Sequence, residues 1–343
     1  MVRRVVLVGC GVMGAGWLRA LAEPDLARRV ELAALVDANL AVAECARQKF
    51  GLTDVPVYGS LQAALSEASA DIVFDVAVPG ARKDIVLEAL RHGCHVLTEK
   101  PMAATLEDAT EILRALDKSG LVHAVTQNRR FKPSIRRIRK FLESGAIGQV
   151  SALHCDFFVG AHFGGFRDEM EHVLLLDMAI HTLDAARFMS GKDADAVYCL
   201  ETNPAGSWYA HGAAANAIFE LGDGVVFTYR GSWAAEGANT SWEAGWRIIG
   251  SKGTLLWDGE ETVTAKVVDG QEGFFRPLRD VDVPAWTDSS VTREHVSVII
   301  DFLDAVESGR PPESPASDNI KSLAMVFGAI ESAKTRQRVT ITI

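Results

Sequence analysis

Two groups of residues in this chain are of types that hold or transfer protons. The first is the tripeptide Glu99-Lys100-Pro101, which directly follows the apolar run His95 to Thr98. Proline restricts the backbone of the residue before it, so we expect the Lys100 side chain to face the crevice beyond the end of a predicted parallel strand. An ammonium group there could stabilise negative charge on a substrate oxygen. The alternative is a solvated surface lysine.

The second group is Asp177 and His181, four residues apart in the apolar stretch 174–184. In a helix, such residues are neighbours on one face. A carboxylate and an imidazole in an apolar helix are costly unless they are used or satisfied, so the pair predicts acid–base chemistry or an internal Asp–His hydrogen bond. We expect no metal, because no further ligand falls at a convincing spacing. Asp184 could orient His181 or be structural.

The elements that position these residues begin at the N-terminus. Val5 to Val8 is typical of a buried parallel strand, and the sequence Gly9-Cys10-Gly11-Val12-Met13-Gly14 follows it before a helical stretch that ends near Ala22. In this context the first glycine permits a tight turn, the second lets the backbone approach a pyrophosphate, and the third allows close helix–strand contact. The loop therefore predicts dinucleotide binding. The alternative is a glycine turn without a ligand.

The next strand, Leu32 to Val36, ends in Asp37. A carboxylate at this position accepts hydrogen bonds from the adenosine ribose and opposes a 2′-phosphate. Ala38 and Asn39 provide no arginine for such a phosphate, so NAD is favoured, with NADP possible. The alternative role for Asp37 is a helix N-cap, and the two roles are compatible.

Apolar runs alternate with helical patterns as far as residue 126, which predicts an α/β chain with an N-terminal Rossmann domain, a doubly wound parallel sheet. The runs are Val5 to Val8, Leu32 to Val36, Ile72 to Ala77, His95 to Thr98 and Leu121 to Val125. Later strand-like stretches are separated by the turns Gly222-Asp223-Gly224 and Asp258-Gly259, and they favour a C-terminal α/β domain with a large, mostly antiparallel sheet. We place the NAD-binding domain at residues 1–126 and the second α/β domain at 127–343.

Composition narrows the classes of function. The formal net charge of −10 opposes nucleic-acid binding, and the basic segment 129–140 is predicted to be an amphipathic helix with Ile135, Ile138, Phe141 and Leu142 buried. No apolar run is long enough to cross a membrane. The five cysteines are widely spaced and include no C-x-x-C pair, so we expect reduced thiols and a cytoplasmic location.

Taken together, these motifs resemble the Gfo/Idh/MocA family, named for glucose-fructose oxidoreductase, inositol dehydrogenase and rhizopine catabolism. The resemblance covers essentially the whole chain. It rests on the glycine loop, Glu99-Lys100-Pro101, Asn128-Arg129-Arg130-Phe131, Gly145-x-x-Gly148 and Asp177-x-x-x-His181. It implies NAD-dependent oxidation or reduction of a small-molecule sugar, inositol or related polyol. It also implies a homodimer or homotetramer packed through the large sheet, so that residues 127–343 form the substrate-binding and oligomerisation domain.

The resemblance also assigns roles to residues. Lys100, Asp177 and His181 are the expected catalytic residues, and with His162 and Arg167 they are expected to bind substrate. The expected cofactor contacts are Gly9, Gly11, Val12, Met13, Gly14, Asp37, Pro79, Glu99, Lys100, Asn128 and Arg129.

Two departures from the family pattern affect the expected sites. Pro79-Gly80-Ala81-Arg82-Lys83 replaces a common Pro-Asn-x-x-His, and Glu171-His172-Val173 replaces small glycines before the catalytic helix. Two other functions also remain open. One is an NAD-dependent glycosidase that acts by transient oxidation and elimination, and the other is a non-enzymatic sugar sensor.

Overall fold

The computed structural model describes residues 2–343 and divides the chain into two compact units. The first contains the chain up to Asn128 together with Ser290–Ile320, and the second contains Arg129–Ser289 and Lys321–Ile343. The sequence boundary at residue 126 lies close to the first division, but the predicted second domain, 127–343, includes segment 290–320, which the structure places in the first unit. The structure differs there because α9 (His295–Ser308) buries Phe302 against Phe74, a residue of the first sheet, with ring centroids 6.3 Å apart.

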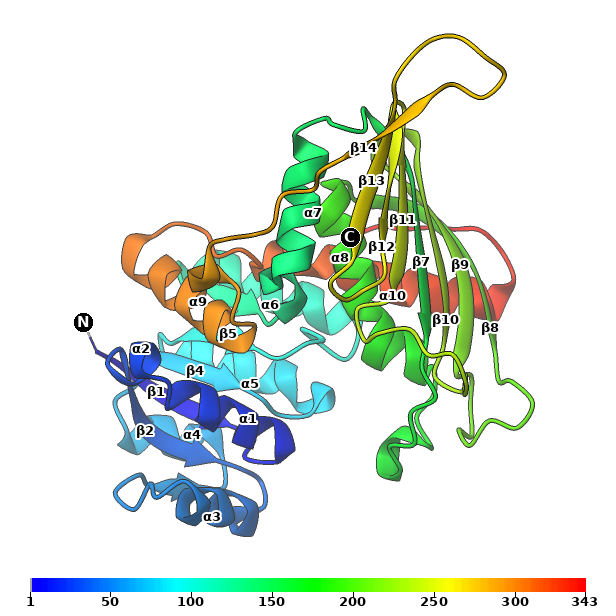
Figure 1. The fold of residues 1–343 in the computed structure, drawn as a ribbon. Coiled ribbons are helices and arrows are strands. Elements are labelled where there is room, and N and C mark those ends of the chain that lie inside the picture. Colours follow the sequence, from blue (N-terminus) through cyan, green and yellow to red (C-terminus); the bar gives the residue numbers. More distant parts are fainter. Residues whose placement is uncertain (1) are drawn as a thin grey trace. The chain divides into compact units, whose positions relative to one another are not determined.

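In the described chain, the sheet of the first unit has six strands that pair only in parallel, which confirms the predicted Rossmann fold (Figure 1). In spatial order they are β3 (Val57–Tyr58), β2 (Val30–Val36), β1 (Arg3–Val8), β4 (Ile72–Asp75), β5 (His95–Thr98) and β6 (His123–Val125). The five predicted runs form β1, β2, β4, β5 and β6. The two-residue strand β3 is too short to leave an alternating pattern.

The helices of the first unit begin at polar caps where the sequence provides them. Asn39, Ser60 and Thr105 each accept a hydrogen bond from a backbone N–H in the first turn of the following helix. The helices are α1 (Val12–Leu21), α2 (Pro24–Ala27), α3 (Leu40–Lys49), α4 (Leu61–Glu67), α5 (Pro79–Arg91), α6 (Leu106–Ser119) and α9. The short η1 (Asn128–Phe131) begins with the last residue of the first segment and continues in the second unit.

The second unit holds a mostly antiparallel sheet of nine strands, counted over residues 2–343, and this confirms the predicted class. Only β10 runs parallel to its neighbour β7. In spatial order the strands are β14 (Leu278–Val281), β13 (Val263–Val268), β12 (Gly253–Trp257), β11 (Gly245–Gly250), β7 (Val150–Phe158), β10 (Val225–Ser232), β9 (Ala214–Leu221), β8 (Ala194–Thr202) and β15 (Val339–Thr340). Both predicted turns join antiparallel neighbours.

Helices cover one face of this sheet, and the other face carries exposed side chains. In α10 (Ala316–Thr335), the Ser332 hydroxyl accepts a hydrogen bond from the Cys199 backbone N–H at 2.8 Å, which ties the helix to β8. Along β8, β9 and β12, buried residues alternate with exposed ones such as Tyr198, Ile218 and Leu256. The remaining helical segments are α7 (Pro133–Glu143), η2 (Gly165–Arg167), η3 (Leu174–Ala179), α8 (Ile180–Ser190), η4 (Gly222–Gly224) and η5 (Ser289–Val291).

The basic segment forms α7, whose buried residues are Ile135, Ile138, Phe141 and Leu142. This confirms the predicted amphipathic helix. Among residues 2–343, the structure contains no helix with the length and apolar character needed to cross a bilayer.

Candidate active site

The glycine loop after β1 has the geometry that its spacing predicts. Gly9 has φ +93°, and a Cβ on it would lie 2.6 Å from the Val76 carbonyl carbon. A Cβ on Gly14 would lie 2.1 Å from the Gly9 carbonyl oxygen, so the helix approaches the strand closely. Gly11 differs, because a Cβ there would meet nothing within 4 Å. The loop therefore leaves open space at the N-terminus of α1, and this fits a pyrophosphate held by backbone N–H groups.

Apolar side chains stand exposed beside this loop. Val12 is 91% exposed and Val78, which precedes α5, is 71% exposed, while Met13 is about half exposed. Pro79 is the first residue of α5. Large apolar residues with this exposure are available to contact an apolar ring of a ligand.

Asp37 holds the backbone between the glycine loop and α3. Its Oδ2 accepts a hydrogen bond from the Cys10 N–H at 2.9 Å, and its Oδ1 accepts one from the Asn39 N–H at 2.9 Å. Asn39 is the N-cap of α3, since its Oδ1 accepts from the Ala41 N–H at 3.1 Å. The capping role considered for Asp37 therefore belongs to Asn39, and contact of Asp37 with a ribose stays a prediction.

Lys100 lies two residues beyond the end of β5, next to a buried carboxylate. The Glu99 carboxylate accepts hydrogen bonds from Trp17 Nε1 at 2.8 Å, from the Lys100 backbone N–H at 3.2 Å and from His295 Nε2 at 3.2 Å. The Lys100–Pro101 peptide bond is cis. Glu99 therefore fixes the backbone beside Lys100, and its predicted contact with a cofactor stays a prediction.

The partners of Glu99 also set its charge state. Burial would raise the pKa of Glu99, but the hydrogen bonds from His295 and Trp17 outweigh it and leave the pKa below its ordinary value. Burial would likewise lower the pKa of His295, but its contact with Glu99 raises that pKa. The lowered pKa of Glu99 and the raised pKa of His295 both favour a charged carboxylate beside a charged imidazolium.

In the second unit, Asp177 and His181 lie on two different kinds of helix. Asp177 belongs to η3, a π-helical segment, and His181 lies in the first turn of α8. The predicted single α-helix is therefore corrected at its N-terminal part. A π-helix widens the turn and occurs often at functional sites, so the two side chains are not related by regular α-helical spacing. Just before this segment, His172 has φ +54° and contacts Glu201 through its ring.

Arg167 contacts Asp177 directly. Its Nε donates a hydrogen bond to Asp177 Oδ2 at 2.6 Å. Its guanidinium carbon lies 5.0 Å and 4.8 Å from the ring centroids of Phe163 and Phe166, distances typical of cation–π contacts. His162, on the same loop, instead stacks on Trp208 with centroids 3.6 Å apart and contacts Glu236 at 2.8 Å.

Aromatic rings gather around Phe163. Its ring centroid lies 5.1 Å from that of Trp233 and 6.2 Å from that of Trp242. Trp233 is buried, whereas Trp242 and Phe163 are each nearly half exposed. The second unit thus offers two aromatic faces near the loop that carries Arg167.

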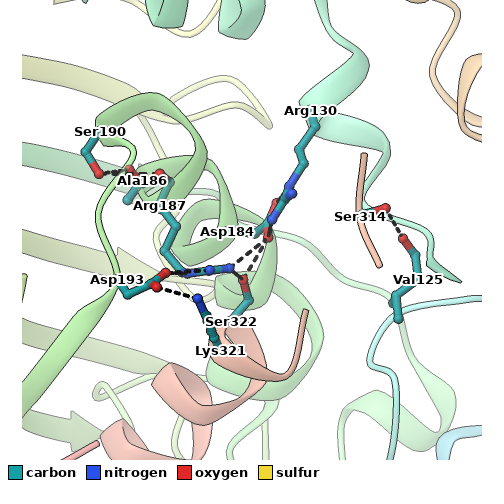
Figure 2. Close-up of polar contacts among 10 residues, drawn as sticks. All are labelled: Val125, Arg130, Asp184, Ala186, Arg187, Ser190, Asp193, Ser314, Lys321 and Ser322. Atoms are coloured by element: carbon teal, nitrogen blue, oxygen red, sulfur yellow. Dashed lines mark hydrogen bonds and ion pairs between the residues drawn. The ribbon is translucent and has the colours of Figure 1, made fainter. Parts of the chain in front are cut away.

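Asp184 belongs to a buried hydrogen-bond network, which favours the structural role of the two that the sequence leaves open. It accepts hydrogen bonds from Arg130 Nε at 2.8 Å, Arg130 Nη2 at 2.6 Å and Ser322 Oγ at 2.7 Å (Figure 2). Arg187 donates to the same serine at 2.8 Å and also contacts Asp193. This buried network joins η1, α8 and α10, and partners so distant in sequence leave no pattern that could have predicted it.

The predicted cofactor contacts Asn128 and Arg129 fall on different units. Asn128 Nδ2 donates to Glu294 Oε2 at 3.3 Å within the first unit. Arg129 is buried in the second unit, with its Nε 3.3 Å from Glu243 Oε2 and its Nη2 3.6 Å from Met178 Sδ. Over residues 2–343, no group of three or more His, Cys, Asp or Glu side chains is arranged to hold a metal ion.

Comparison with known proteins gives matches over most of the chain. The sequence model of an oxidoreductase family with an NAD-binding Rossmann fold matches residues 3–127, and that of the GFO/IDH/MocA C-terminal domain matches residues 135–256. The chain is 27% identical to a D-apiose dehydrogenase of Paraburkholderia graminis, covering 98% of this chain and 88% of that protein. It is 28% identical to an inositol 2-dehydrogenase of an Arthrobacter species, covering 85% and 86% respectively.

A solved structure supports the fold. An oxidoreductase from Agrobacterium radiobacter, in complex with NAD+, L-tartaric acid and magnesium, superposes with a TM-score of 0.85. The two chains are 22% identical, and 99% of each is covered.

Proposed function

The chain belongs to the Gfo/Idh/MocA family of oxidoreductases and uses NAD, and on that premise we propose that it oxidises a hydroxyl group of a sugar, inositol or related polyol, or reduces the corresponding ketone. One observation carries the proposal. The glycine loop follows β1 and Lys100 follows β5, and both strands belong to the same parallel sheet, in the order β1-β4-β5. Their carboxyl ends therefore lie at the edge where such sheets bind dinucleotides and substrates.

Bound NAD supplies nicotinamide C4 as the acceptor of the hydride that leaves the carbinol carbon. The residues proposed to hold the cofactor are Gly9, Gly11, Val12, Met13, Gly14, Asp37, Pro79, Glu99, Lys100, Asn128 and Arg129. The open space at Gly11 supports a pyrophosphate there. The Asp37 carboxylate disfavours a 2′-phosphate and therefore supports NAD over NADP.

The proton chemistry is proposed to divide between two residues. A neutral His181 accepts the proton of the substrate hydroxyl, because an imidazole is the side chain best suited to this task near neutral pH. Lys100 hydrogen-bonds the same oxygen and stabilises its developing negative charge. Asp177, held by Arg167, binds a neighbouring hydroxyl and selects the carbon that reacts.

Two further observations support a polyhydroxylated substrate. The exposed faces of Trp242 and Phe163 can pack against the C–H faces of a sugar ring. The relatives named D-apiose dehydrogenase and inositol 2-dehydrogenase act on substrates of this class. His162 and Arg167, on the loop beside these rings, are proposed to contact substrate hydroxyls.

The uncovered face of the nine-stranded sheet is the proposed contact between subunits. It is hollowed and lined by residues that include Tyr198, Ile218 and Leu256, which are apolar and exposed, and the Asp156–Arg230 ion pair. A face with this mixture of exposed apolar and paired charged side chains fits a second copy of the same chain.

The experiment is nicotinamide reduction by the purified protein across monosaccharides, inositols and sugar acids, with NAD and NADP in parallel. We expect NADH to accumulate with one group of substrates and NAD to be preferred. Glycoside cleavage without net NADH would instead indicate the glycosidase, and sugar binding without turnover would indicate the sensor.

A further inference from the structure

Arg82 is a buried charged residue that the proposed chemistry does not use. It lies in α5 and is 3% exposed. Its Nη2 donates to the Ala77 carbonyl at 2.8 Å, and its Nη1 donates to the Pro101 carbonyl. Its Nε lies 3.7 Å from Asp75 Oδ2. One guanidinium therefore joins the loop after β4 to the loop after β5.

Asp75 completes this arrangement. It is fully buried at the end of β4, and its Oδ1 accepts a hydrogen bond from the Ala77 N–H at 3.0 Å. Asp75 and Arg82 thus bind the N–H and the carbonyl of the same residue. Desolvation makes a buried ion pair costly unless its groups are also hydrogen-bonded. Here both members of the ion pair also hydrogen-bond backbone groups of Ala77, and Arg82 hydrogen-bonds the Pro101 carbonyl as well. These bonds offset part of the cost of burying the two charges.

The two fixed points lie on either side of Lys100. Pro101 follows it and is held by Arg82, whereas Glu99 precedes it and is held by Trp17 and His295. All of these residues belong to the first unit. We propose that Arg82 is a positioning residue for Lys100, which fixes the direction of the ammonium group by holding the Pro101 carbonyl. The proposal rests on the proposed function, in which Lys100 binds the reacting oxygen.

Lys83 shows why the effect is specific to Arg82. It is the next residue of α5, but its Nζ contacts Asp108 at 2.7 Å and Glu111 at 3.4 Å on α6. Its side chain is 33% exposed. Replacing Lys83 therefore removes a cation from the same helix without touching the loop of Lys100, which makes Lys83→Met a matched control.

The test compares Arg82→Met, Arg82→Lys and Lys83→Met in the full chain. For Arg82→Met, we expect kcat per folded molecule to fall about tenfold or more, while the Kd for NAD changes by less than about threefold. Arg82→Lys keeps the charge and one contact, so it should recover part of kcat. Lys83→Met should stay within about twofold of the wild type. Equal kcat in Arg82→Met and wild type would overturn the proposal, as would a loss in Lys83→Met of the same size as that in Arg82→Met.

A second readout does not depend on turnover. The rate of reductive methylation of the Lys100 amine, measured by peptide mass spectrometry, reports its environment directly. We expect Arg82→Met to change this rate by about threefold or more relative to other lysines, and Lys83→Met to leave it unchanged. An unchanged rate in Arg82→Met overturns the proposal even if no substrate is found, whereas a silent substrate panel alone counts against the proposed function. If Arg82→Met does not fold, the methylation rate of Lys100 is compared between Arg82→Lys and the wild type instead, and an unchanged rate again overturns the proposal.

Discussion

At the scale of single residues, Lys100 stands between two neighbours whose polar atoms are already engaged. Glu99 is held by Trp17 and His295, and the Pro101 carbonyl is held by Arg82. The chemistry of Lys100 could be inferred from its place after a predicted strand. Its supports could not, because His295 lies 196 residues from Glu99 in the chain and nothing local in the sequence pairs them.

The Glu99–His295 pair predicts a stability difference with a defined pH window. Its contribution is full above the ordinary Glu pKa of 4.5 and below the ordinary His pKa of 6.5. It is lost as pH falls through the lowered pKa of Glu99, and as pH rises through the raised pKa of His295. We expect Glu99→Gln to be less stable than the wild type, with the largest difference in the free energy of unfolding between pH 4.5 and pH 6.5. Urea unfolding across a pH series measures the margin, and a margin independent of pH would contradict the ion pair.

At the scale of elements, hydrophobic periodicity predicted five of the six strands of the first sheet and helix α7, because burial determines those patterns. It predicted one α-helix through Asp177 and His181, where the structure has η3 followed by α8. The apolar residues 174–176 fit either kind of helix, so the sequence pattern does not distinguish them.

The pairing of β5 with β6 predicts a contribution to acid unfolding. His123 Nε2 lies 2.9 Å from Thr98 Oγ1 in the core, and burial lowers the His123 pKa to about 3. Between that value and the ordinary 6.5, the unfolded chain binds a proton that the folded chain does not, so stability falls as pH falls. We expect His123→Gln to reduce this slope by up to about 1.4 kcal/mol per pH unit. An unchanged slope in His123→Gln would refute the account.

The network of Asp184 predicts a large loss of stability. Asp184→Asn removes the charge that neutralises buried Arg130, and leaving one partner of a buried ion pair uncompensated costs about 3–5 kcal/mol. Chemical denaturation measures this loss. Asp223→Asn, which breaks the exposed contact with Lys192, should leave the stability nearly unchanged, because solvent screens that pair. Similar losses of stability in Asp184→Asn and Asp223→Asn would contradict a structural role for the buried Asp184 network.

At the scale of the whole molecule, the sequence located the change from parallel to antiparallel architecture but not the return of the chain to the first unit. Segment 290–320 rejoins that unit through α9, and only packing reveals this, because an amphipathic helix carries no mark of the sheet that it covers. The open face of the second sheet could not be located from periodicity either. Alternating apolar and polar residues show that a strand has two different faces, but they do not show what packs against each face.

The open face leads to a prediction about assembly. Ile218→Asp and Leu256→Asp place charges on exposed apolar positions of that face, so we expect the double variant to sediment as a monomer. The control Val2→Asp changes an exposed residue of the first unit and should keep the wild-type mass. Retention of the oligomer by the double variant, measured by analytical ultracentrifugation, would rule out this face as the interface.

The measurement that tests the central claim most directly is single-turnover NADH formation by Lys100→Met, made together with NAD binding by calorimetry. We expect the rate to fall by about 100-fold or more, because the charge that stabilises the reacting oxygen is lost. The Kd for NAD should change by less than about threefold, because Lys100 is one of many proposed cofactor contacts and the glycine loop is unchanged. An unchanged rate with the substrate that the wild type oxidises would contradict the role of Lys100 and the site built around it.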